Sequence, residues 1–149
     1  MGVIRNARNE EISVIADFQL LMARETEGLQ LDKGTILKGI ESVFNDPNKG
    51  QYYVYLIDNE LVGCLLTTPE WSEWRNGTVL WIQSVYVKEP FRGMGVFKEL
   101  YEHIQAIVSQ NSNLVGIRLY VEKENINAQK VYKKMGMNGD HYKLFEWLK

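Results

Sequence analysis

A glycine-rich turn stands between a predicted strand at residues 78–87 and a predicted helix that begins near Val96. Its sequence is Arg92-Gly93-Met94-Gly95. A strand, a glycine turn and a helix in this order aim backbone N–H groups at an anion, and glycines let the backbone approach that anion without a Cβ in the way. The helix N-terminus adds about half a positive charge, and Arg92 adds a full one. The pattern predicts a pyrophosphate cradle, although a tight turn that needs positive φ explains the same glycines equally well.

A second motif runs from Asn125 to Gly136 and contains Ala128 and Tyr132. Asn125 is a typical helix N-cap, Ala128 allows close packing, and Gly136 is a typical helix end. Tyr132 has two interpretations. Its ring fits the buried row of the helix, and its phenol, with an ordinary pKa of about 10, can also act as a general acid toward a thiolate leaving group.

Acidic and aromatic side chains gather in a predicted loop and at the end of the first predicted helix: Glu70, Trp71, Glu73 and Trp74 in the loop, Glu25 and Glu27 in the helix. Two tryptophans so close together favour walls of a substrate site. For any single Glu, a solvated surface charge is the favoured interpretation, and the tryptophans also fit a cover over the sheet edge.

Together the two motifs resemble those of the GNAT N-acetyltransferase superfamily. The acetyl-CoA loop of that family reads Gln/Arg-x-x-Gly-x-Gly/Ala, which Arg92 and Gly95 match, whereas Phe97 stands where Gly or Ala is usual. The later signature, Asn-x-x-Ala-x-x-x-Tyr-x-x-x-Gly, is met by Asn125, Ala128, Tyr132 and Gly136. The order of elements matches over essentially the whole chain, and the specific motifs span residues 78–137.

The resemblance implies a site and a mechanism. Acetyl-CoA would lie where the predicted strands at 78–87 and 115–121 diverge, in contact with Val85, Tyr86, Val87, Arg92, Gly93, Met94, Gly95, Val96, Phe97, Asn125, Ala128 and Tyr132. An amine would attack the thioester directly, and Tyr132 would protonate the departing CoA thiolate. The long strand carries Gln83 and Ser84 where the family often has an acid. The resemblance therefore leaves Glu70 and Glu73, the nearest acids in the sequence, as candidate bases for the proton that the attacking ammonium must lose. The acceptor would then be surrounded by Gln83, Glu25, Glu27, Trp71 and Trp74.

The elements that position these residues follow from the periodicity of apolar side chains. Strands are predicted at Val3–Ala7, Gln51–Ile57, Leu61–Thr68, Thr78–Val87, Val115–Val121 and His141–Leu148. Helices are predicted to begin at the caps Asn9, Asp32 and Asn125 and at the glycine turn Gly93-Met94-Gly95. The first two end at Gly28 and at Asp46-Pro47, and a loop is predicted from Glu70 to Gly77. Hairpins mixed with crossovers predict an α+β (mixed α/β) fold, the GNAT fold, with a central mixed, mostly antiparallel sheet and helices on both faces.

Composition and net charge limit the classes of function that this chain can have. The 149 residues and net charge of −2 predict a single domain over residues 1–149 and argue against a nucleic-acid binder. Cys64 is the only cysteine and there are two histidines, which excludes an internal disulfide and argues against a metal site. With no signal peptide and no apolar run of membrane length, a cytoplasmic protein without a membrane partner is expected. Whether the chain forms a homodimer stays open.

The sequence therefore predicts an acetyl-CoA-dependent N-acetyltransferase that uses no metal and acts on a small-molecule or peptide primary amine. Two alternatives remain. One is a non-catalytic acyl-CoA-binding or sensing module on the same fold. The other is transfer of a different acyl group, or transfer to oxygen.

Overall fold

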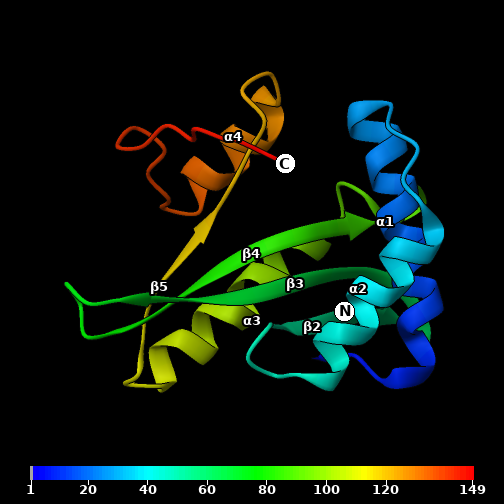
Figure 1. The fold of residues 1–149 in the computed structure, drawn as a ribbon, viewed down its shortest axis with the longest axis horizontal. Helices are drawn as coiled ribbons and strands as arrows, with labels where there is room; N and C mark the ends of the chain where they lie inside the picture. The colour runs from blue at the N-terminus through cyan, green and yellow to red at the C-terminus, as the bar shows by residue number, and fades with distance from the viewer. Residues whose placement is uncertain (1) are drawn as a thin grey trace. The chain divides into compact units, whose positions relative to one another are not determined.

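A computed structural model describes residues 2–149 (Figure 1). The chain divides into two compact units, the first ending at Leu119 and the second spanning Tyr120–Lys149. They are described in turn. The single domain expected over residues 1–149 stays a prediction.

The first unit is built on a five-stranded sheet in the order β1-β2-β3-β4-β5. Neighbouring strands from β1 to β4 are antiparallel, and β5 runs parallel to β4. The strand bounds are β1 Val3–Asn6, β2 Gln51–Ile57, β3 Glu60–Ser72, β4 Gly77–Val87 and β5 Leu114–Leu119. The mixed, mostly antiparallel sheet predicted from the sequence is confirmed.

Helices cover both faces of this sheet. The helices are α1 Ile12–Glu27, α2 Lys33–Asn45 and α3 Val96–Gln110, with short 3-10 turns η1 Asn9–Glu11 and η2 Glu89–Phe91. Alternate residues of a strand point to opposite faces. Tyr52 and Val54 of β2 accordingly join one core cluster with α1 and α2, whereas Tyr53 and Tyr55 meet α3, where the Tyr55 hydroxyl donates to Glu99 over 2.5 Å. These apolar contacts hold α1 and α2 against one face of the sheet and α3 against the other.

Local capping signals set most helix ends. Gly28 ends α1 with a φ of +63°, and the Asp32 carboxylate caps α2 by accepting from the Thr35 N–H over 2.8 Å. The predicted cap at Asn9 is wrong: residues Asn9–Glu11 form the 3-10 turn η1, and α1 begins at Ile12. Glu11, the last residue of this turn, accepts from the Arg8 N–H over 2.7 Å and forms an ion pair with Arg5 of β1 at 2.7 Å.

The hairpin between β3 and β4 is longer than the sequence predicts. Glu70, Trp71 and Ser72 belong to β3 and pair with residues of β4, so the predicted loop from Glu70 to Gly77 shrinks to a turn at residues 73–76. Backbone pairing with the long strand β4 extends the ladder through these three residues, whose own periodicity does not indicate a strand.

The second unit contains α4, Ile126–Lys134, and no other helix or strand. Asn125 caps α4 as predicted: its Oδ1 accepts from the Ala128 N–H over 3.1 Å. The predicted strand at His141–Leu148 is wrong, because this segment pairs with no strand among the described residues. A strand requires a partner for its backbone groups, which its own alternation does not supply.

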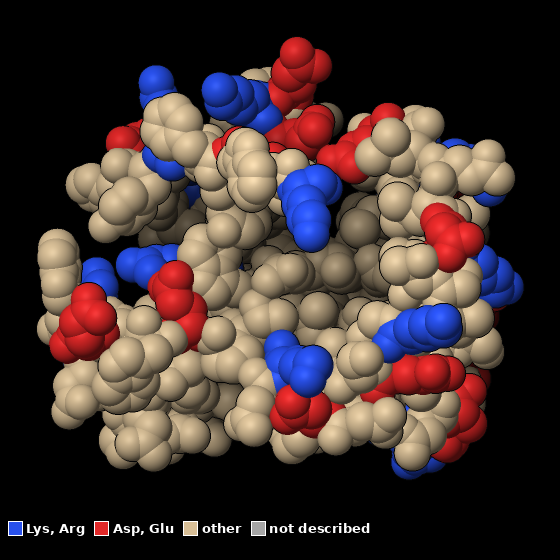
Figure 2. Space-filling view, viewed as in Figure 1, with Lys and Arg blue, Asp and Glu red and all other residues tan. Residues whose placement is uncertain are grey.

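Charged side chains of both signs are interspersed over the face shown in Figure 2, in line with the small net charge. In the part of the chain that the structure describes, none of the helices is long and apolar enough to cross a bilayer.

Candidate functional site

Strands β4 and β5 diverge part-way along their length. Their pairing runs from Thr78 opposite Leu114 to Ile82 opposite Leu119, where β5 ends. Strand β4 continues to Val87. Among the described residues, no strand therefore pairs with β4 beyond Ile82 on the side away from β3. This is the divergence that the sequence motifs implied, and it leaves an extended backbone edge open to a ligand.

A β-bulge interrupts β4 at this open edge. Tyr86 lies opposite Cys64 and Gln83 opposite Leu66, so two residues of β4 oppose one of β3. Ser84 within the bulge has a φ of +54°, in the left-handed region that few non-glycine residues adopt. Bulges of this kind bend a strand and re-aim its backbone groups.

Gln19 of α1 holds the bulge in place. Its Nε2 donates to the Ser84 carbonyl over 3.2 Å. The side chain is only 5% exposed, and its Oε1 is buried without a hydrogen-bond partner. Sequence reasoning missed this residue, although one signal was present: Gln19 is a polar residue in a helix row that otherwise buries Ile15 and Phe18.

The glycine-rich turn follows β4 and the 3-10 turn η2. Gly93 and Gly95 have φ of +76° and +86°, and a Cβ at either position would meet no atom within 4 Å. Gly95 is the N-cap of α3, and the first helical bond runs from the Glu99 N–H to its carbonyl. The N–H groups that precede Glu99 in the first turn have no acceptor within the helix. The turn thus combines the left-handed backbone that glycine favours with open space beside both glycines.

Arg92 and Glu25 meet beside this turn. Arg92 Nη2 donates to a Glu25 carboxylate oxygen over 2.6 Å, and Arg92 Nε donates to the Val87 carbonyl over 2.8 Å. The guanidinium also lies over the Tyr86 ring, 5.4 Å from its centre. The Tyr86 hydroxyl donates to Glu25 over 3.2 Å, and burial, followed by the Glu25 charge, raises the pKa of Tyr86. Glu25, predicted beside the acceptor, therefore lies beside the predicted phosphate turn and partly neutralises Arg92.

Glu70 lies on the sheet face that carries Gln83. Gln83 Nε2 donates to Thr68 Oγ1 over 2.6 Å, and Glu70 follows Thr68 by two positions, which puts both on one face of β3. The carboxylate of Glu70 forms an ion pair with Arg118 of β5, which reaches it across β4. Arg118 is a second residue that sequence reasoning missed, because its partner is distant in the chain.

The other residues predicted beside the acceptor lie on different elements and on different faces of the sheet. Trp71 adjoins Glu70 in β3 and so points to the opposite face. Glu73 and Trp74 lie in the exposed turn after β3, and Glu27 is the exposed last residue of α1. The structure thus brings Glu70 and Gln83 to one face and does not bring Trp71 to it.

Asn125, Ala128 and Tyr132 belong to the second unit. The Asn125 amide oxygen is engaged as the helix cap. Burial raises the pKa of Tyr132 above its ordinary value. Its phenol therefore holds its proton at neutral pH, as a general acid requires.

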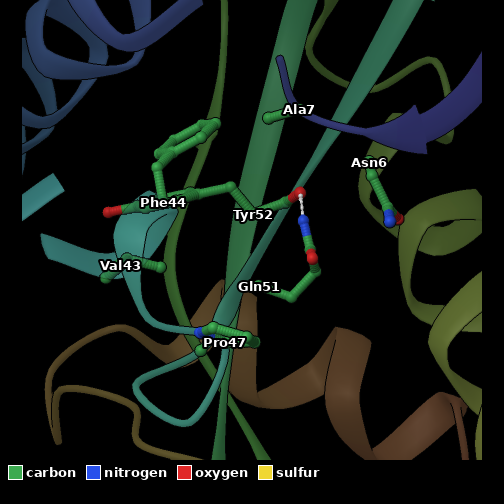
Figure 3. A pocket seen from close by; sticks show the side chains of 8 residues that line it. Asn6, Ala7, Val43, Phe44, Pro47, Gln51 and Tyr52 are labelled. Carbon is green, nitrogen blue, oxygen red and sulfur yellow. Dashed lines mark hydrogen bonds between the residues drawn. The ribbon is translucent and has the colours of Figure 1, made fainter. Parts of the chain in front are cut away.

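A cavity of about 280 Å³ lies elsewhere in the first unit (Figure 3). Its lining consists of Asn6, Ala7, Val43, Phe44, Pro47, Gly50, Gln51 and Tyr52. The side-chain amide of Gln51 donates to the Tyr52 carbonyl, and the rings of Phe44 and Tyr52 stack with their centres 5.9 Å apart. No residue of the predicted site lines it.

Comparison with known proteins identifies the family. The sequence model of the Acetyltransferase (GNAT) family matches residues 16–137. The chain belongs to the GNAT acetyltransferase family. The resemblance and the fold class predicted from the sequence are confirmed. No curated protein matches the sequence.

Solved structures of the same fold agree with GNAT membership. A possible acetyltransferase from Clostridium difficile 630 is 42% identical, covers 100% of this chain and 98% of its own, and has a TM-score of 0.93. A predicted acetyltransferase from Clostridium acetobutylicum, solved with acetyl-CoA, is 17% identical, with coverage of 98% and 96% and a TM-score of 0.77. A ribosomal-protein-alanine N-acetyltransferase from Brucella melitensis is 14% identical, with full coverage of both chains at 100% and a TM-score of 0.80. The latter two show the fold alone.

Proposed function

We propose that this GNAT domain transfers an acetyl group from acetyl-CoA to a primary amine by direct attack in a ternary complex. The observation that carries the proposal is the free edge of β4 from Gln83 to Val87, which begins where β5 ends and leads toward the glycine turn. An extended ligand arm can add to a free strand edge through backbone hydrogen bonds. Family membership and the acetyl-CoA bound by a solved relative support the same assignment.

The residues along β4 and the turn fit the cosubstrate. The pantetheine arm runs along Val85, Tyr86 and Val87, and the backbone N–H groups from Gly93 to Phe97 hold the pyrophosphate. The open space around both glycines supports this, because a bulky anion needs close access to the backbone. Arg92 is a positioning residue here: its bond to the Val87 carbonyl ties the turn to the end of β4.

The reaction needs a polarised carbonyl, a proton donor and a proton acceptor. Acetyl-CoA supplies the thioester carbon, which the amine nitrogen attacks as the C–S bond breaks. A backbone N–H at Val85, aimed by the bulge, hydrogen-bonds the carbonyl oxygen as negative charge grows on it. Tyr132 gives its phenolic proton to the departing thiolate.

Glu70 is the candidate that orients the amine or accepts its proton, directly or through water. It lies on the same face as Gln83, whereas Glu73 lies in the exposed turn. Arg118 pairs with Glu70 and so fixes the carboxylate in place. Because Glu25 and Glu70 are each neutralised by an arginine, the acids named here supply less attraction for a strongly cationic acceptor than their number suggests.

A second candidate function is that of a non-catalytic acyl-CoA-binding module. The observation in its favour is that β4 carries Gln83, bonded to Thr68, where a carboxylate would serve as a base. This module would bind acetyl-CoA in the same way and release no CoA with any amine.

The deciding experiment incubates the full chain with acetyl-CoA and a panel of small amines, amino acids and short peptides with free N-termini. Release of free CoA is followed with a thiol reagent, and mass spectrometry must find the acetylated amine. Amine-dependent CoA release supports the transferase. Tight acetyl-CoA binding by calorimetry with no product from any amine supports the binding module, and no binding at all overturns both.

A further inference from the structure

Glu25 and Arg92 form an ion pair at the edge of the proposed acetyl-CoA site. Arg92 Nη2 lies 2.6 Å from a carboxylate oxygen of Glu25, and the side chains of Arg92 and Glu25 are 44% and 37% exposed. Ion pairs with this much access to solvent contribute little to stability, because water and salt screen them. The pair can therefore open readily when either side chain is offered a stronger partner.

Pyrophosphate is such a partner for Arg92. This residue directly precedes the glycine turn that is proposed to hold the pyrophosphate. Its Nε donates to the Val87 carbonyl, which keeps the guanidinium beside the turn, and its Nη2 donates to Glu25. Guanidinium groups bind phosphate through charge-assisted and often bidentate hydrogen bonds, and a pyrophosphate carries more negative charge than one carboxylate. Bound acetyl-CoA therefore competes with Glu25 for Arg92.

Tyr86 keeps Glu25 in place when Arg92 changes partner. The Tyr86 hydroxyl donates to Oε1 of Glu25 over 3.2 Å, whereas Arg92 binds Oε2. The Tyr86 side chain is itself held firmly, because it is 6% exposed and its ring packs on Phe18 with the centres 5.0 Å apart. Tyr86 also adjoins Val85, the proposed donor to the thioester carbonyl. Once Arg92 turns to the phosphates, a fixed carboxylate with one oxygen available therefore remains near the reacting end of acetyl-CoA.

We propose that Glu25 is a binding residue for a cationic acceptor, and that it becomes available only after the phosphates of acetyl-CoA have engaged Arg92. The inference rests on the proposed function, whose acetyl-CoA site it uses. It makes the binding of the two substrates cooperative, and the coupling is reciprocal: each raises the affinity for the other by the same factor. Because the ion pair that opens is exposed and weak, the expected factor is roughly two- to fivefold.

The first test measures this coupling without turnover. Calorimetry follows the binding of benzylamine, a monocation at neutral pH, to the full chain with and without CoA, which has no acetyl group to transfer. Benzyl alcohol is the neutral probe of the same shape. CoA should raise the affinity for benzylamine roughly two- to fivefold and leave that for benzyl alcohol unchanged. Equal benzylamine affinity with and without CoA overturns the proposal.

Three variants show whether Glu25 carries the coupling. Glu25→Gln should bind benzylamine equally weakly with and without CoA; coupling that survives in this variant comes from the charge of CoA itself and overturns the proposal. Arg92→Gln should bind benzylamine without CoA as tightly as the wild type binds it with CoA, because Glu25 is then unpaired. Glu89→Gln is the matched control: it removes the same charge three positions from Arg92, whereas Arg92 donates to Val87 and Glu25. It should keep the coupling of the wild type.

The two conclusions fail separately. Acetyl transfer to an amine of the panel, without coupling in the wild type, overturns the role of Glu25 and leaves the transferase standing. Coupling that depends on Glu25, without transfer to any amine, supports the role of Glu25 and overturns the transferase. A chain that does not bind CoA overturns both.

Discussion

Gln19 is the residue through which the fold controls the bulge of β4, and replacing it separates stability from function. Gln19→Leu keeps the approximate shape of the side chain but removes both the donor to Ser84 and the unpartnered Oε1. The Ser84 carbonyl then loses its buried partner, at a cost of about 1–3 kcal/mol. Removing the buried Gln19 Oε1, which has no hydrogen-bond partner, stabilises the folded state by a similar free energy. We therefore expect the free energy of unfolding to change by no more than about 1 kcal/mol.

Turnover should respond differently, because the proposed carbonyl donor at Val85 adjoins the released bulge. Loss of one preorganised donor costs about 10²–10³-fold in kcat, and an N–H that is only misaligned should cost at least tenfold. The KM for acetyl-CoA should change less than kcat. Urea unfolding and steady-state kinetics on the same preparation measure both. Met22→Leu, a volume-conserving change on the same helix, is the control. It should change neither the free energy of unfolding nor kcat by much.

Two results would refute this reasoning. If Gln19→Leu keeps wild-type kcat, the hydrogen bond to Ser84 does not position a catalytic group. If unfolding becomes easier by more than about 3 kcal/mol, the amide contributes to the core and the two terms do not offset each other.

The other predictions concern the cofactor turn and the proposed proton transfers. Gly95→Asp should weaken acetyl-CoA binding at least tenfold, about 1.4 kcal/mol by calorimetry; Gly95→Asn, which shares the backbone constraint but not the charge, should weaken it less, and equal losses would contradict a charge effect. Tyr132→Phe should lower turnover by about 10²–10⁴-fold with acetyl-CoA affinity retained, and normal turnover would make Tyr132 a packing residue. Glu25→Gln should strengthen acetyl-CoA binding by roughly two- to fivefold, because an exposed ion pair with Arg92 is worth at most about 1 kcal/mol; weaker binding would show that Glu25 is needed to hold the turn. Glu70→Gln should lower turnover at neutral pH and recover partly at higher pH, where more amine is unprotonated, and an unchanged pH–rate profile would place the base elsewhere.

Local signals in the sequence were sufficient to predict most helix ends of this protein and its family. Gly28 ends α1 and Asn125 begins α4 where the sequence predicts, because left-handed backbone and side-chain caps involve residues only a few positions apart. The acetyltransferase motifs are equally local. Their spacing places the glycine turn at the start of α3 without knowledge of the rest of the fold.

The tertiary structure decided which side chains meet. Gln19 reaches Ser84 over a separation of 65 residues, and Glu25 reaches Arg92 over 67. Neither pair has a local pattern, because the contact arises from how α1 packs on the sheet. Sequence reasoning therefore placed Glu25 beside the acceptor and did not identify Gln19.

Strand pairing was decided in the same way. Residues 70–72 form a strand with β4 as their partner, whereas residues 141–148 pair with none of the described strands. A helix satisfies its backbone groups within its own segment, so its sequence is sufficient to predict it. A strand satisfies them only with another strand, so its existence depends on a neighbour that the sequence does not name.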